Sequence, residues 1–127
     1  MPTHPIVHVE IPARDLVAAG QFYAEVFDWQ LDTSMPNYPQ FQAEGGPGGG
    51  FVAVSDEASE TTLRYAPGEV LIYLDADDID AALARVEAHG GKTLVARTEI
   101  PAIGYWAMFE DPTGNRIGLY SALHRHA

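Results

Sequence analysis

The chain contains an internal repeat of about sixty residues, and this repeat constrains the fold more than any other feature. Residues 13–23 (ARDLVAAGQFY) align with residues 76–86 (ADDIDAALARV) at an offset of 63 positions. In this alignment Asp15 matches Asp78, and an Ala-Ala pair follows in both copies. Two copies of this length indicate a duplicated supersecondary unit and not a solenoid.

A strand-like run precedes each copy of the repeated segment. Residues 6–11 (IVHVEI) alternate, so that His8 and Glu10 share one face of the predicted strand and apolar side chains share the other. Residues 70–74 (VLIYL) are continuously apolar, which is typical of a strand buried on both faces.

The repeated segments themselves predict helices over residues 16–27 and 79–89. Asp15 can accept a hydrogen bond from the first-turn amides of the first helix, and Asp77 or Asp78 can do so in the second. The glycine pair at 90–91 is expected to end the second helix. The predicted inner stripe of the first helix comprises Leu16, Ala19, Phe22, Tyr23, Val26 and Phe27, and that of the second Ile79, Ala82, Leu83 and Val86.

Strand-rich sequence broken by turn residues follows each predicted helix, so each half has the order strand–helix–strand–strand–strand. The later strands are expected near 29–34, 38–43 and 50–54, and near 92–99, 104–110 and 115–121. A turn over residues 111–114 (DPTG) should join the last two strands, because proline presets φ and glycine tolerates positive φ. We therefore predict one α+β domain, with module one at about 5–54, a linker at about 55–68 and module two at about 69–122.

Composition excludes several classes of protein. The 127 residues include no cysteine, which rules out disulfides, thiolate metal sites and cysteine nucleophiles. The formal net charge of −11 makes nucleic acid an unsuitable partner, because such a surface repels phosphate. No apolar run is long enough to span a membrane, and residues 1–10 do not resemble a secretory signal. We expect a soluble, cytoplasmic protein.

Three motifs in order identify a family. They are HVEIPARDLVAAGQFYAEVFDW (8–29), DADDIDAALARVEAHGGK (75–92) and IPAIGYWAMFEDPTGNRIGLYS (100–121). Together they resemble the vicinal oxygen chelate superfamily of glyoxalases, bleomycin resistance proteins and extradiol dioxygenases, and within it the short, single-domain, glyoxalase-like bacterial members. The resemblance implies two βαβββ modules that form a curved mixed sheet around a cleft, and a homodimer.

The resemblance also implies where metal ligands would lie, on the first and last strand of each module. His8 occupies the first such position, whereas Leu71 and Gly118 occupy two others, and the fourth falls within residues 49–52 (GGFV), which carry no donor side chain. A divalent ion needs several converging donors. We therefore expect no metal and no cofactor, unless Glu10 with Glu110 or Asp75 forms a rearranged site.

His8 and Glu10 are the candidate catalytic residues, because a carboxylate beside an imidazole can form a proton-transfer pair. They can equally serve as polar lining of a binding pocket. The loss of a side chain at 118 should leave room for an organic ligand. Strand alternation, together with the ligand positions that the family resemblance implies, predicts which side chains line a ligand-binding cleft. They are His8, Glu10, Phe51, Tyr73, Trp106 and Tyr120.

The glycine-rich run at 45–50 (GGPGGG) is not a phosphate-binding loop, because it lacks the following Lys-Ser/Thr and precedes a strand. A rim loop, or a close approach of backbone that missing side chains permit, is expected there.

Three functions are open on the sequence alone. The first is a metal-independent small-molecule binding protein, whose ligand would be cationic or aromatic given the acidic charge and the aromatic lining. The second is a lyase or isomerase that uses His8 and Glu10 as acid and base, or a rearranged divalent-metal site. The third is a dimeric accessory protein with a vestigial cleft.

Overall fold

The computed structural model describes residues 3–54 and 65–123. It divides into two compact units. We call Val7–Leu71 module one, and Ile72–Ala127 together with Met1–Ile6 module two. Most of the predicted linker (residues 55–64), and the terminal His124 and His126, lie outside the described residues.

The described part of module one contains one helix and four strands. Strands β2, β3, β4 and β1 lie side by side in that order. The first and last strands, β1 and β4, pair in parallel, and the other neighbours are antiparallel. The elements are β1 (Ile6–Ala13), α1 (Leu16–Phe27), β2 (Gln30–Asp32), β3 (Gln40–Gln42) and β4 (Gly48–Ala53).

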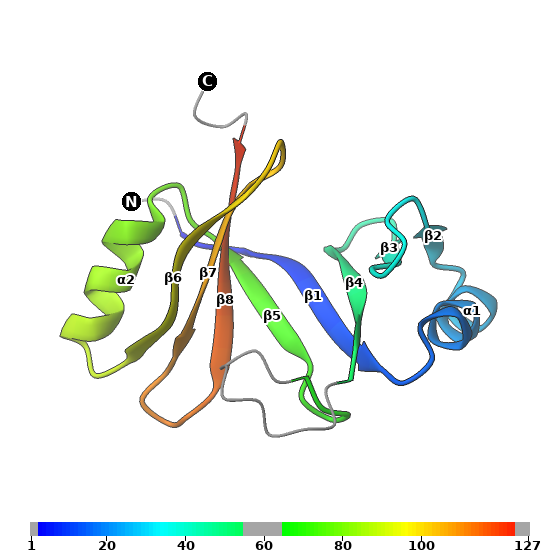
Figure 1. The fold of residues 1–127 in the computed structure, drawn as a ribbon, viewed down its shortest axis with the longest axis horizontal. Coiled ribbons are helices and arrows are strands. Elements are labelled where there is room, and N and C mark those ends of the chain that lie inside the picture. The colour runs from blue at the N-terminus through cyan, green and yellow to red at the C-terminus, as the bar shows by residue number, and fades with distance from the viewer. Residues whose placement is uncertain (1–2, 55–64, 124–127) are drawn as a thin grey trace. The chain divides into compact units, whose positions relative to one another are not determined.

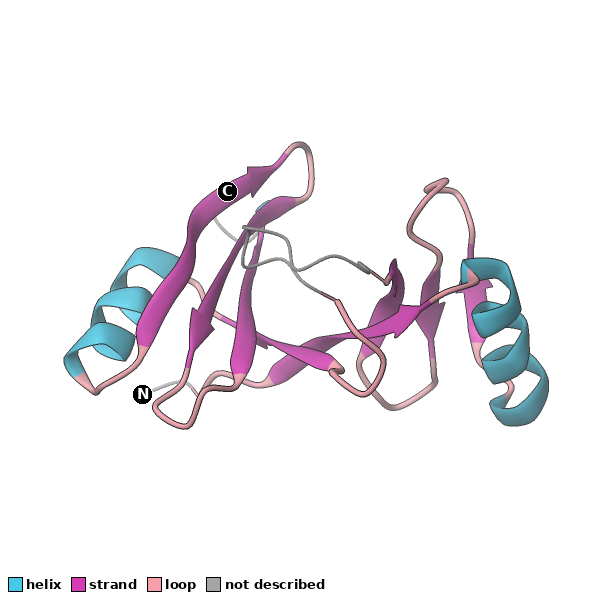
Figure 2. Ribbon diagram, turned by 60° about the horizontal axis from the view of Figure 1, so that its bottom comes forward, coloured by secondary structure: helices cyan, strands magenta, loops and turns pink. Residues whose placement is uncertain are grey.

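Module two repeats this arrangement. Its strands lie in the order β6, β7, β8, β5, and again only the first and last strands, β5 and β8, pair in parallel. The predicted α+β class and the order strand–helix–strand–strand–strand are confirmed in both modules (Figures 1 and 2). The elements are β5 (Leu71–Asp75), α2 (Ile79–Ala88), β6 (Lys92–Ile100), β7 (Gly104–Glu110) and β8 (Arg116–Ala122).

The repeated aspartates cap the two helices in the same way. The Asp15 carboxylate accepts a hydrogen bond from the Ala18 N–H at 3.0 Å, and the Asp78 carboxylate accepts one from the Ala81 N–H at 3.0 Å. Each bond satisfies a first-turn amide that has no partner within its helix. Beyond α2, Gly90 takes a φ of 94°, the left-handed conformation predicted to end that helix.

The predicted turn between β7 and β8 is also confirmed. Gly114 has a φ of 108°. The Asp111 carboxylate accepts hydrogen bonds of 2.9 Å from the backbone N–H groups of Thr113, Gly114 and Asn115. These bonds lower the pKa of Asp111, the Asn115 backbone bond most strongly.

Stacked aromatic rings form the core of module one. The Trp29 ring lies 4.8 Å from the Tyr23 ring and 4.3 Å from the Phe41 ring, measured between centroids. Phe51 closes the cluster at 5.2 Å from Phe41 and 5.7 Å from Tyr23. The rings come from α1, from the connection between α1 and β2, and from β3 and β4, so this cluster holds the helix against the sheet.

The predicted inner stripe of α1 was wrong at three positions. Phe22, Val26 and Phe27 expose 55%, 53% and 57% of their surface. The side of α1 that faces the sheet carries Tyr23, as predicted, together with the buried Gly20. Small residues let the helix approach closely, since a Cβ on Gly20 would lie 3.2 Å from the Leu31 side chain.

The core of module two is aliphatic and lies between α2 and the sheet. Ile79 and Leu83 of α2 are buried, as the sequence predicted. They pack with Ala76, Ala107 and Leu119. Figure 1 shows α2 alongside β6. Within the described residues, neither helix has the length and apolarity that crossing a membrane would require.

Two glycines of the last strands lie under tyrosine rings. In the strand register Glu10 lies opposite Gly50 and Tyr73 opposite Gly118. A Cβ on Gly118 would overlap the Tyr73 ring, and one on Gly50 would overlap the Tyr38 ring. The expectation that Gly118 leaves room for a ligand was therefore wrong, because Tyr73 fills that space.

Substitution of Gly118 tests this packing. We expect Gly118→Ala to lower the free energy of unfolding by about 1–3 kcal/mol, because the added methyl forces Tyr73, which is 7% exposed, from its position. Urea denaturation measures the change. Gly46→Ala is the matched control, since nothing lies within 4 Å of its added Cβ. Equal stability of the two variants would show that the Tyr73 ring is free to move.

Candidate functional site

His8 and Glu10 lie on one face of β1 and are joined by a third residue, Tyr38. The Tyr38 hydroxyl donates a hydrogen bond to the Glu10 carboxylate at 2.8 Å. The same hydroxyl oxygen lies 2.6 Å from Nε2 of His8. Glu10 is only 8% exposed, and His8 and Tyr38 are half-buried. The three side chains therefore form one hydrogen-bonded chain, which we call the His8–Tyr38–Glu10 relay.

The number of hydrogens on the Tyr38 hydroxyl determines which groups of the relay donate and which accept hydrogen bonds. A phenol carries a single proton, and Tyr38 gives it to Glu10. The second contact of the hydroxyl, to His8, must then have Nε2–H as donor and the phenol oxygen as acceptor. In a neutral imidazole with a proton on Nε2, the lone pair is on Nδ1.

Burial determines the charges in the relay. Desolvation lowers the pKa of His8, which favours the neutral imidazole. Desolvation and the Glu10 carboxylate raise the pKa of Tyr38 well above its ordinary value of 10, so the phenol keeps its proton. His8 is thus neutral in the relay, with its proton on Nε2, and is connected through the Tyr38 hydroxyl to the Glu10 carboxylate.

Tyr38 was missed by the sequence analysis, which placed it at the start of the strand predicted over 38–43 and outside the three family motifs. It lies in the turn between β2 and β3, where its N–H bonds to the Met35 carbonyl at 3.3 Å. The available signal was Gly50, whose missing side chain lets the Tyr38 ring lie over β4 next to Glu10.

A hollow of about 360 Å³ lies beside the relay within module one. Because side chains alternate along strands, the positions opposite one another in the register point to the same face. On the face of His8 all the side chains lining the hollow are polar. The lining residues are Val7, His8, Gln30, Leu31, Asp32, Gln40, Phe41, Gln42, Gly48 and Gly49.

Of the other predicted ligand-binding residues, Phe51 belongs to module one and the remaining three belong to module two. Phe51 is fully buried in the aromatic core, on the face of β4 opposite Gly50. Tyr73 covers Gly118. Trp106 and Tyr120 lie opposite each other on β7 and β8, both half-buried. Within module one the structure thus brings His8 and Glu10 together on one face of β1 and places Phe51 on the other face of the sheet.

Residues 5–119 match the model of the Glyoxalase/Bleomycin resistance protein/Dioxygenase superfamily. The chain belongs to this superfamily. Its repeated module order is the arrangement that the sequence resemblance implied.

Two similar proteins and one solved structure are distant relatives of this chain. CFP32 of Mycobacterium tuberculosis, named as a candidate glyoxylase, is 29% identical over 93% of this chain and 45% of its own length. The anthracycline biosynthesis protein DnrV of Streptomyces peucetius is 27% identical over 83% of this chain and 42% of its own. The chain thus spans less than half of these relatives. The methylmalonyl-CoA epimerase structure from M. tuberculosis shares the fold, with a TM-score of 0.74 at 19% identity, covering 96% of this chain and 91% of that one.

The ligand positions of metal-dependent superfamily members do not fit a divalent ion here. The strand register identifies Gly50 as the ligand position that the sequence left within residues 49–52. Gly50 and Gly118 both lie under tyrosine rings. Leu71 offers no donor atom, and His8 directs a protonated nitrogen to Tyr38. Over residues 3–54 and 65–123, no three His, Asp or Glu side chains are grouped closely enough to hold an ion.

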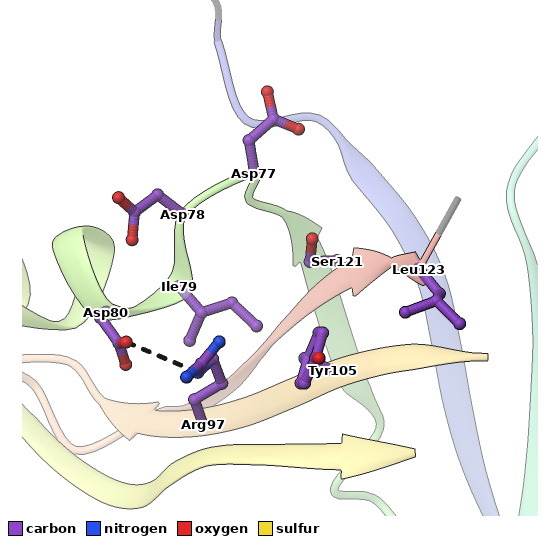
Figure 3. Close-up of a pocket in the computed structure, with 8 residues that line it drawn as sticks. All are labelled: Asp77, Asp78, Ile79, Asp80, Arg97, Tyr105, Ser121 and Leu123. Atoms are coloured by element: carbon purple, nitrogen blue, oxygen red, sulfur yellow. Dashed lines mark ion pairs between the residues drawn. The ribbon is translucent and has the colours of Figure 1, made fainter. Parts of the chain in front are cut away.

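A second hollow, of about 570 Å³, lies in module two beside the first turn of α2 (Figure 3). Arg97 of β6 dominates it, with its guanidinium 5.0 Å from the centroid of the Tyr105 ring and its Nε 3.5 Å from the Asp80 carboxylate. These contacts tie β6 and β7 to α2. Both partners of the ion pair are largely exposed, so the pair contributes little stability.

Acidification should destabilise the protein through His8. Burial lowers the pKa of His8 in the folded state. Below about pH 6.5, the pKa of histidine in the unfolded chain, the unfolded protein therefore binds a proton at His8 that the folded protein does not bind. The stability contributed by neutral His8 is full above that pH and is lost as the pH falls through it. In urea denaturation between about pH 8 and pH 5, the wild type should lose more stability than His8→Gln.

In the same pH series, substitution of the exposed His89 by glutamine should leave the dependence of the wild type unchanged. If His8→Gln and His89→Gln showed the same pH dependence, His8 would not be held neutral by burial.

Removing the Tyr38 hydroxyl should also be costly. Tyr38→Phe takes a donor from the buried Glu10 and an acceptor from His8, so we expect a loss of about 1–3 kcal/mol in unfolding free energy. Tyr105→Phe is the control, because phenylalanine keeps the ring beneath Arg97. Chemical denaturation compares the two. Similar losses would mean that the relay contributes no more than an ordinary tyrosine hydroxyl.

Proposed function

We propose that the chain is a metal-independent small-molecule binding protein whose site is the His8 face of module one. The observation that carries this proposal is the bond between Nε2 of His8 and the Tyr38 hydroxyl. A metal ligand must offer a lone pair, and because Nε2 carries a proton in the relay, only Nδ1 of His8 could offer one; the described residues contain no group of three donors that would complete such a site. His8, the one ligand position of the superfamily that keeps a donor, thus acts as a hydrogen-bond donor.

The surroundings of the relay support binding of an organic ligand. The hollow beside it has a volume within the usual range of small-molecule pockets, at the lower end. Rings fill the space above Gly50 and Gly118, where metal-dependent relatives carry ligands. The names of two relatives, a candidate glyoxylase and an anthracycline biosynthesis protein, also concern small organic molecules.

A second candidate function is proton transfer on a bound ligand, which the relay itself favours. Nδ1 of a neutral His8 can take a proton from the ligand and return it to a neighbouring atom, which would isomerise the ligand with no net change in atoms. The resulting imidazolium would be stabilised through Tyr38 by the Glu10 carboxylate. The two functions differ in one respect: turnover needs the basic nitrogen of His8, whereas binding needs only the donor N–H.

Metal content and thermal melting test the proposed function. The purified, untagged protein should contain no stoichiometric ion. Its melting temperature should not change with chelator or with added Zn²⁺, Ni²⁺, Mn²⁺ or Fe²⁺, because no set of donors within residues 3–54 and 65–123 converges on His8. His8→Ala serves as the control for unspecific effects. A bound ion that is lost in His8→Ala, with a melting shift of several degrees on chelation, would overturn metal independence.

A further inference from the structure

Carboxamide side chains gather on the face of module one that carries His8. The whole chain has only four glutamines. Gln30, Gln40 and Gln42 line the hollow of about 360 Å³, and the fourth, Gln21, lies exposed on α1. Three of the four glutamines thus line one hollow, so a ligand bound there would meet mainly carboxamide groups.

The strand register fixes the spacing of these amides. Gln30 lies directly opposite Gln42 on the neighbouring strand, where side chains are about 5 Å apart. Gln40 and Gln42 are two residues apart on β3 and point to the same face, about 7 Å from each other. An area of this size corresponds to one six-membered ring with its substituents, which also suits the volume of the hollow.

Charge in the hollow is sparse. Among the described residues that line it there is no lysine or arginine, so an anionic ligand would have no cationic partner there in a chain of net charge −11. Asp32 is the one carboxylate among the described residues that line the hollow, and its Oδ1 accepts a hydrogen bond from the Ser34 N–H at 2.9 Å. That carboxylate is also exposed, where solvent screens its attraction for a cation.

Resting on the function proposed above, we infer that this hollow takes an uncharged organic ligand that presents a hydrogen-bond donor next to an acceptor, as amides, lactams and nucleobase-like heterocycles do. A carboxamide offers both an N–H donor and a carbonyl acceptor, so it can pair with such an edge without any charge. The Nε2 of Gln40 already donates to the Met35 sulfur at 3.1 Å, which fixes its orientation. This ligand is neither cationic nor purely aromatic, unlike the one that the sequence suggested.

Three probes with the same ring separate the possibilities: benzamide, benzylamine and benzoate differ only in the charge and hydrogen bonding of the head group. The readout is the ¹H–¹⁵N spectrum of the glutamine side-chain NH₂ groups of the intact protein. Benzamide should shift the signals of Gln30, Gln40 and Gln42 in a saturable way and leave Gln21 unchanged. Benzylamine and benzoate should bind more weakly at the same signals.

Variants test whether the amides themselves bind the probe. Gln42→Met keeps the length of the side chain and removes its hydrogen bonds, so benzamide should bind about five-fold more weakly. Gln21→Met on α1 is the matched control and should bind like the wild type. Both side chains are exposed, so both variants should fold. If Gln42→Met lost the dispersed spectrum of the wild type, Gln30→Met would make the same test.

The outcomes separate this inference from the proposed function. Tighter binding of benzylamine or benzoate at these signals would overturn the uncharged ligand class but leave a small-molecule site. If no probe shifted the three signals, or if Gln42→Met bound benzamide like Gln21→Met, the carboxamide site would be overturned. The metal measurements described above decide metal independence separately from either result.

Discussion

Parallel pairing between the first and last strand of each module is the constraint on which the rest of the structure depends. It sets Glu10 opposite Gly50 in module one and Tyr73 opposite Gly118 in module two. Parallel neighbours require a crossover connection, which in each module contains the helix capped by the repeated aspartate. The chemistry of the candidate site therefore follows from a backbone register that the duplicated sequence specifies twice.

The two modules fill the space above the equivalent glycines in different ways. In module two the ring comes from β5 itself, since Tyr73 occupies the repeat position of Glu10 and packs over Gly118. In module one that position keeps a carboxylate, and the ring comes from the turn before β3. Tyr38 thus covers Gly50 and also brings a hydroxyl between His8 and Glu10. Duplication preserved the fold, and divergence placed the polar chemistry in module one.

The sequence predicted those features that depend on local pattern. Helix caps, turns and strand alternation are local, so the module order and the shared face of His8 and Glu10 followed from the residues alone. Prediction from the sequence failed where a residue far along the chain contacts the site. Tyr38 reaches the strand from 28 residues away, and no period marks such a residue. The predicted inner stripe of α1 was wrong at Phe22 and Val26 because the helix packs through Tyr23 and Gly20, which hydrophobicity alone does not reveal.

His8 shows that a residue's presence at a ligand position is weaker evidence for metal binding than the protonation of its ring nitrogens. A histidine at a ligand position of the superfamily suggests a metal, yet coordination depends on which ring nitrogen holds the lone pair. In this chain the Tyr38 hydroxyl must give its one proton to Glu10, and that requirement leaves Nε2 of His8 as a donor. The same residue therefore belongs to a hydrogen-bonding surface, continuous with the glutamines of β2 and β3, because of a tyrosine that lies outside the family motifs.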